Sequence, residues 1–105
     1  EDKDLMKLRL GLIEEEWHEL LDAYDAEDFV EVVDALADMV YVIYGFARGI
    51  GVDLDEILAE VHRSNMTKLD KNGNPIFRDD GKILKSDLFE EPRIAEILAQ
   101  RGYVV

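Results

Sequence analysis

The sequence predicts an all-α fold: an antiparallel bundle of about four helices with a small C-terminal β-hairpin, completed by oligomerisation. Three observations predict it. Apolar residues recur at helical spacing over most of residues 4–68. One predicted helix is apolar on nearly every side and needs more cover than so short a chain supplies. With 105 residues and no cysteine, the chain suits a single domain, 1–105, with one modest core and no disulfides.

Two long helices are expected in the first half of the chain. The first runs from about Asp4 to Tyr24. The second runs from about Phe29 to Arg48 and stops at Gly49-Ile50-Gly51, a typical C-terminal signal. Asp28 is a candidate N-cap, and Glu31 three residues later completes a capping-box pattern, a role as well supported as a functional one. The short turn at residues 25–28 predicts that the two helices are antiparallel neighbours.

The second helix is the most apolar segment of the chain. One side carries Val30, Val33, Ala37, Val40 and Tyr44, and the rest carries Val32, Leu36, Met39, Ile43 and Phe46. A helix of this kind must be covered nearly all round. We therefore expect an obligate oligomer, most simply a homodimer, with a tetramer built from two dimers as the alternative.

Shorter elements are expected in the second half. Asp53 begins another capping-box pattern and opens a helix over about residues 54–68. Turn-forming residues 71–75 follow, and then Ile76-Phe77-Arg78 and Lys82-Ile83-Leu84 flank a turn and predict the small hairpin. A last short helix is expected to start near Pro92 and to end before Gly102.

The charge is strongly negative and uneven. The net charge is −13, with −14 in residues 1–60 and +1 in residues 61–105. So acidic a front half disfavours a nucleic acid or an anionic membrane as partner and suits divalent cations. The longest apolar run, Met39 to Ala47, is too short to span a bilayer. Together with the absence of cysteine, this predicts a cytoplasmic protein.

Five carboxylates stand out from the acidic background. Glu15, Glu16 and Glu19 fall within roughly 100° of one face of the first helix. Asp34 and Asp38 are one turn apart on the apolar second helix, at a comparable height along the pair. Acids on apolar helices repel one another and are costly to bury without partners. A bound divalent cation removes both penalties.

A salt-bridged surface stripe is the competing interpretation. It lacks basic partners, because the bases expected on these two helices stand well away from the acids: Lys7, Arg9 and Arg48. Hard cations such as Mg²⁺, with Mn²⁺ as an alternative, take oxygen ligands that two antiparallel helices can bring together. The pattern therefore favours a metal site.

The segment Glu15-Glu16-Trp17-His18-Glu19 resembles the Glu-Glu-x-x-Glu motif of the all-α nucleoside triphosphate pyrophosphohydrolases. These are the MazG-like enzymes, related to phosphoribosyl-ATP pyrophosphohydrolase. The family's second motif is Glu-x-x-Asp, and Asp38 fits its Asp. Ala35 stands where its Glu would be, with Asp34 one residue earlier. The segment 62–68 resembles the family's substrate-contacting Asn-x-x-Lys.

The resemblance implies a Mg²⁺-dependent hydrolase that cleaves between the α- and β-phosphates and releases a nucleoside monophosphate and pyrophosphate. It implies metal ligands at Glu15, Glu16, Glu19 and Asp38, with Asp34 as a further ligand and one of the three glutamates as catalytic base. It also implies substrate contacts from Asn65 and Lys68. Arg78 and Lys82 of the expected hairpin are candidates for a phosphate contact, as well explained by a balanced surface beside Asp79 and Asp80.

Two rival interpretations remain open at this stage. Glu15-x-x-His18 fits one half of a di-iron carboxylate site, which needs two such elements unless a dimer supplies the second. A non-catalytic oligomeric helical module would use its acids only for solubility. The sequence does not identify the nucleotide that an enzyme of this kind would hydrolyse.

Overall fold

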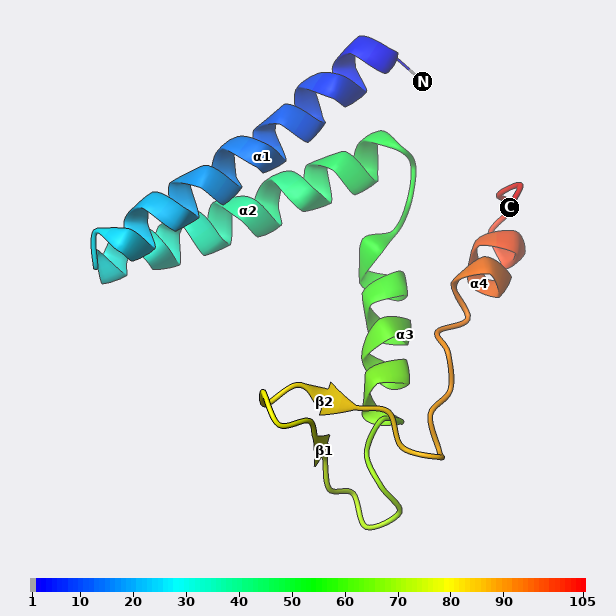
Figure 1. Ribbon diagram of the computed structural model, residues 1–105. Coiled ribbons are helices and arrows are strands. Elements are labelled where there is room, and N and C mark those ends of the chain that lie inside the picture. Colours follow the sequence, from blue (N-terminus) through cyan, green and yellow to red (C-terminus); the bar gives the residue numbers. More distant parts are fainter. Residues whose placement is uncertain (1) are drawn as a thin grey trace. The chain divides into compact units, whose positions relative to one another are not determined.

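The computed structural model describes residues 2–105, which form two compact units, the first ending at Leu54 and the second comprising Asp55–Val105. The described residues form four helices and one two-stranded antiparallel hairpin, which confirms the predicted all-α class with a small hairpin (Figure 1). None of these helices combines the length and apolar character needed to cross a bilayer. The elements are α1 (Lys3–Asp25), α2 (Phe29–Gly49), α3 (Leu54–Met66), β1 (Ile76–Phe77), β2 (Ile83–Leu84) and α4 (Ile94–Gln100).

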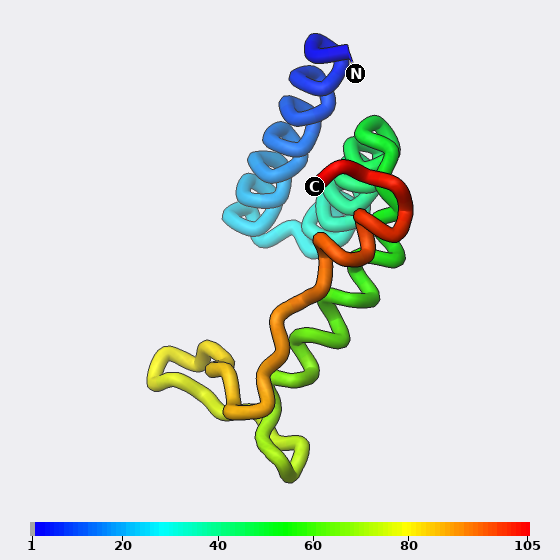
Figure 2. Tube along the Cα trace, turned by 90° about the vertical axis from the view of Figure 1, so that its right-hand side faces the viewer, coloured from blue at the N-terminus to red at the C-terminus, as the bar shows by residue number. Residues whose placement is uncertain are grey.

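The first unit is a hairpin of two long helices. Figures 1 and 2 both show α1 and α2 side by side along their length. The side chain of Asp2 caps α1 by accepting hydrogen bonds from the backbone N–H groups of Asp4 and Leu5 at 3.0 and 3.2 Å. In the tight turn, Glu27 has a φ of 55°, in the left-handed region that few non-glycine residues adopt. Asp28 then caps α2 as predicted, accepting from the N–H of Glu31 at 3.1 Å.

The contact between α1 and α2 is built on small residues. The buried apolar residues of the hairpin are Ala23, Ala35 and Ala47, with exposed fractions of 8%, 4% and 6%. Larger apolar side chains remain open to solvent on both helices, Phe29 at 79% and Leu8 at 60% among them. The hairpin therefore brings two backbones close together but leaves much apolar surface uncovered.

In the second unit, a polar seam joins α3 to the extended segment 86–93, which we call the strap. Ser64 is 2% exposed, and its hydroxyl donates to the carbonyl of Glu90 at 2.7 Å. The Glu90 N–H donates to the Thr67 hydroxyl at 2.8 Å. Arg63 donates to the carboxylates of Glu60 and Glu90, both at 2.8 Å. These bonds fix the chain that follows the hairpin against one side of α3.

The β-hairpin and the C-terminal helix complete this unit. Ile76 pairs with Leu84 and Phe77 with Ile83, as expected for a short antiparallel ladder. Gly81 sits in the connecting turn with a φ of 89°, which glycine adopts without strain. The hairpin continues into the strap, where the Ser86 N–H donates to the Lys68 carbonyl at 3.1 Å.

Replacing Ser64 with alanine should destabilise the second unit, because the substitution leaves the Glu90 carbonyl without this donor. We expect a loss of about 1–2 kcal/mol in the free energy of unfolding, measured by urea denaturation. Asn72→Ala, at an exposed turn position, is the matched control. Equal stability of the two variants would show that the seam does not hold the strap.

Candidate metal and nucleotide site

Acidic side chains from both long helices surround one hollow near the turn of the α1–α2 hairpin. Its volume is about 390 Å³. The buried Ala35 and Ala23 lie among its walls, so small residues leave the space that the acids surround. The acidic residues that line it are Glu19 and Asp22 from α1, Asp28 at the turn, and Glu31, Asp34 and Asp38 from α2.

Glu16 of α1 interacts with three of these acids, Glu19, Asp34 and Asp38, although it is not among the residues that line the hollow. The residue is half-buried, and its Oε2 atom is shut off from solvent without a hydrogen-bond partner within the described residues 2–105. Desolvation raises the pKa of Glu16 above its usual 4.5, and a side-chain hydrogen bond with Glu19 raises it further. The negative charges of Glu19, Asp38 and Asp34 add to the effect. Acids from both helices are thus close together around Glu16.

The structure brings together four of the five predicted carboxylates: Glu16, Glu19, Asp34 and Asp38. Glu15 is exposed and is not among the acids that act on Glu16, so its role stays a prediction. Across the described residues 2–105, no three Asp, Glu or His side chains already surround a single point as metal ligands would. The donor set nevertheless fits a hard cation, because it is all oxygen and contains a buried carboxylate oxygen with no partner.

Ala35, which stands where the expected second motif has a glutamate, is buried and lines the acidic hollow. The segment Glu31-Val32-Val33-Asp34 has the Glu-x-x-Asp spacing one turn earlier, and both of its acids line the hollow. The sequence left the role of Glu31 undecided, because a capping box was as well supported as a functional role.

Only half of that capping box forms. Asp28 accepts from the Glu31 N–H, but the Asp28 N–H donates to the Ala23 carbonyl at 3.1 Å instead of to the Glu31 carboxylate. The side chain of Glu31 is therefore not used for capping. It lines the acidic hollow, which makes Glu31 a candidate ligand that the motif alone had left undecided.

The predicted substrate residues lie in the second unit. Asn65 is exposed on α3 and lines a hollow of about 550 Å³ together with Leu58 and His62. Lys68 follows α3, and its N–H donates to the Asn65 carbonyl at 3.1 Å. The seam with the strap lies immediately beside Asn65 and Lys68, because Ser64 and Thr67 form its centre.

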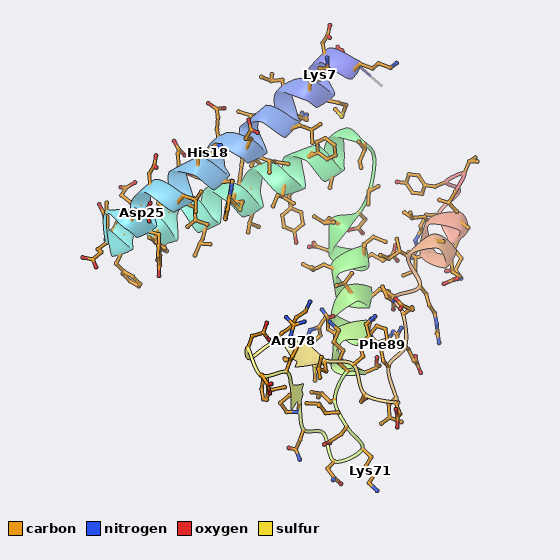
Figure 3. The ribbon with its side chains drawn as sticks, in the orientation of Figure 1. Lys7, His18, Asp25, Lys71, Arg78 and Phe89 are labelled. Atoms are coloured by element: carbon orange, nitrogen blue, oxygen red, sulfur yellow. The ribbon has the colours of Figure 1, made fainter. Side chains whose placement is uncertain are left out.

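The two hairpin candidates are engaged locally. Arg78, which is labelled in Figure 3, lies next to the β-hairpin. It forms an ion pair with Asp80, to which its Nε donates at 2.9 Å. The backbone N–H of Lys82 also donates to Asp80, at 3.1 Å. This pairing is what the balanced-surface interpretation expects of Arg78, and a phosphate contact from Arg78 or Lys82 stays a prediction.

Comparison with known proteins agrees with the geometry. The chain is 35% identical over 86 residues to an uncharacterized protein of Acanthamoeba polyphaga mimivirus; the match covers 82% of the chain and 32% of the viral protein. The sequence pattern of the phosphoribosyl-ATP pyrophosphohydrolase family matches residues 1–65, the segment that holds α1, α2 and nearly all of α3. The chain therefore belongs to the phosphoribosyl-ATP pyrophosphohydrolase family, within the MazG-like all-α nucleotide pyrophosphohydrolases.

Proposed function

We propose that the protein is a Mg²⁺-dependent nucleoside triphosphate pyrophosphohydrolase that cleaves between the α- and β-phosphates. The observation that supports this most is the carboxylate cluster around Glu16, with its buried oxygen and raised pKa. Family membership supports hydrolysis of a phosphoanhydride. A di-iron site is less well supported, because His18 is exposed and the sequence holds no second Glu-x-x-His.

Glu16, Glu19, Asp34 and Asp38 are the proposed ligands, and Glu31 is a fifth. Bound Mg²⁺ would polarise phosphate oxygens and offset the charge that develops during hydrolysis. Without an ion, the carboxylates would repel the negatively charged triphosphate. An ion bound to them would remove this repulsion and attract the phosphate oxygens. Glu16 is the proposed base, because its carboxylate lies beside Glu19, Asp34 and Asp38, where it would face a water held by the ion that these acids bind.

Asn65 and Lys68 are the proposed substrate contacts in the second unit. Lys68 offers a positive charge for a phosphate oxygen, and the Asn65 amide both donates and accepts hydrogen bonds. The strap restricts the end of α3 through Ser86, whose hydroxyl donates to the carbonyls of Thr67 and Leu69 at 3.1 and 2.7 Å. The seam thereby limits the motion of the backbone that carries Lys68.

The activity is tested by incubating the protein with a panel of ribo- and deoxyribonucleoside triphosphates and Mg²⁺. We expect pyrophosphate and the monophosphate in equal amounts from at least one of them. Release of inorganic phosphate in place of pyrophosphate would contradict the proposed cleavage position. Absence of turnover across a panel that also contains phosphoribosyl-ATP would contradict the function.

We also propose that a second copy of the chain covers the apolar stripe of α2. Phe29, Val33 and Leu36 follow one another at spacings of four and three residues, and each is between 48% and 79% exposed. Such a 3.5-residue repeat is typical of a helix that packs against a partner helix. The stripe lies on a different face of α2 from Glu31, Asp34 and Asp38, so pairing along it leaves the acidic hollow open.

Replacing Val33 with aspartate should convert the homodimer into a monomer, because it places a charge in the centre of the stripe. Light scattering coupled to size-exclusion chromatography measures the mass directly. Val104→Asp is the matched control, since Val104 is fully exposed near the C-terminus. A wild-type protein that is monomeric at micromolar concentration would rule out this proposal.

A further inference from the structure

A second hollow between α1 and α2 has a basic lining. Its volume is about 500 Å³. Two of the four bases in the first 60 residues, Arg9 of α1 and Arg48 of α2, line it, and no acid is among its described lining residues. The remaining lining comes from α2: Ala37, Val40, Tyr41, Tyr44 and Gly45. In a segment with a charge of −14, this gathering of cations at one place needs an explanation.

The helices hold the Arg9 guanidinium in a fixed place. Its Nη1 donates to the Gly45 carbonyl at 3.1 Å. A Cβ atom at Gly45 would lie 3.2 Å from Nη1, and one at Gly49 would lie 3.2 Å from Nε. Glycine is the weakest helix former after proline. Gly45 and Gly49 therefore reduce the intrinsic helix stability of α2. Gly45 makes room for Arg9, and Gly49 makes room for Arg9 and for Met6, whose Cε would lie 2.8 Å from an added Cβ.

The guanidinium retains unused donors. An arginine has five N–H donors, and Arg9 makes one hydrogen bond with the described residues 2–105. Its Nε is buried and finds no acceptor among them. A purely structural arginine that links α1 to α2, which we call a clasp, would need only the hydrogen bond to Gly45. Arg9 lines the hollow, so its remaining guanidinium N–H groups are available to a ligand with several acceptor oxygens.

The basic hollow continues the acidic one along the same side of α2. Asp34, Asp38, Tyr41, Gly45 and Arg48 are spaced by four, three, four and three residues, so they form one stripe. On α1, Arg9 precedes Glu16 by two helical turns, about 10 Å along the axis. The acidic and the basic hollow are therefore neighbours along one side of the helix pair.

We propose that Arg9 and Arg48 form a binding site for the pyrophosphate moiety of the nucleotide, beside the carboxylate cluster. The proposal rests on the proposed function for the identity of the ligand. The planar guanidinium matches two phosphate oxygens at once. Arg48 in the last turn of α2 also suits the helix dipole, and Arg9 alone would serve as a clasp. Neither role accounts for both arginines lining one hollow with donors to spare.

The test measures the affinity of inorganic pyrophosphate by calorimetry, at saturating Mg²⁺, for the wild type, Arg48→Gln and Arg9→Gln. We expect each substitution to weaken binding at least about tenfold. Lys7→Gln is the matched control, because Lys7 is an exposed base of α1 outside the hollow (Figure 3). If the enzyme is active, KM for the best nucleotide should rise by a similar factor in the arginine variants, with a smaller change in kcat.

Arg48 is exposed, so its replacement keeps the test valid even if Arg9→Gln unfolds the hairpin. Pyrophosphate affinity that is unchanged in Arg48→Gln, or equally reduced in Lys7→Gln, would overturn the proposal. A wild type that does not bind pyrophosphate at millimolar concentration would overturn it as well. Arginine-dependent binding of pyrophosphate without hydrolysis of any nucleotide would instead support the site and refute the proposed function.

Discussion

Replacing Glu16 with glutamine should lower kcat for pyrophosphate release by about a hundredfold to ten-thousandfold, the range expected for loss of a catalytic base. The amide removes the proton acceptor and one anionic metal ligand while keeping the shape of the side chain. It also removes the repulsion between Glu16 and Glu19, Asp34 and Asp38. The metal-free variant should therefore be at least as stable as the wild type, as measured by its Tm.

The matched control for this substitution is Glu14→Gln, an exposed glutamate two residues away on α1. It changes the net charge equally and should leave kcat unaltered. Glu15→Gln then separates a ligand role from a surface position for the predicted carboxylate that is exposed on α1. If Glu16→Gln and Glu14→Gln retain the same activity, Glu16 is not the base.

Addition of Mg²⁺ should raise the Tm markedly at neutral pH. An ion present at a hundredfold its Kd stabilises the folded state by about 2.7 kcal/mol. In a chain of this size that corresponds to a shift of about 10 °C or more. Differential scanning calorimetry with and without EDTA measures it, and Asp38→Asn should abolish most of the shift.

The pH dependence of the metal-free protein follows from the raised pKa of Glu16. The folded state holds this proton more tightly than the unfolded state, whose pKa is near the ordinary 4.5. Glu16 therefore adds to the free energy of unfolding in full at a pH below its unfolded-state pKa. This stabilisation is lost as the pH rises through the pKa of Glu16 in the folded state. Without metal, stability should therefore fall over this interval, and the Mg²⁺-induced shift in Tm should grow with pH. A Mg²⁺ effect that is constant with pH would contradict a carboxylate site.

The helices could be predicted closely because their ends are marked by local chemistry. Asp28 caps α2 as expected, and Gly51, with a φ of 80°, follows its end. The predicted third helix ran on to Lys68, whereas α3 ends at Met66. The backbone of residues 67–69 instead bonds to Ser86, a tertiary contact between distant residues that helical periodicity does not register.

The candidate site could be predicted in part. The spacing of the acids placed Glu16, Glu19, Asp34 and Asp38 on facing sides of two helices, and the structure brings them together. Arg9 was interpreted only as a base remote from the acids. The Arg9 guanidinium is held by Gly45 of α2. A contact between residues 36 positions apart in the sequence becomes visible only when the two helices are packed together.

The acidic hollow near the turn of the α1–α2 hairpin is proposed to bind a divalent cation, and this is the central claim. Anomalous diffraction from crystals soaked in Mn²⁺ tests it most directly, because the signal locates the ion without reference to activity. We expect at least one peak within about 2.3 Å of carboxylate oxygens of Glu16, Glu19 and Asp38, absent in crystals of Asp38→Asn. Mn²⁺ bound only elsewhere on the acidic surface, or an empty hollow in well-ordered crystals at saturating Mn²⁺, would contradict the account.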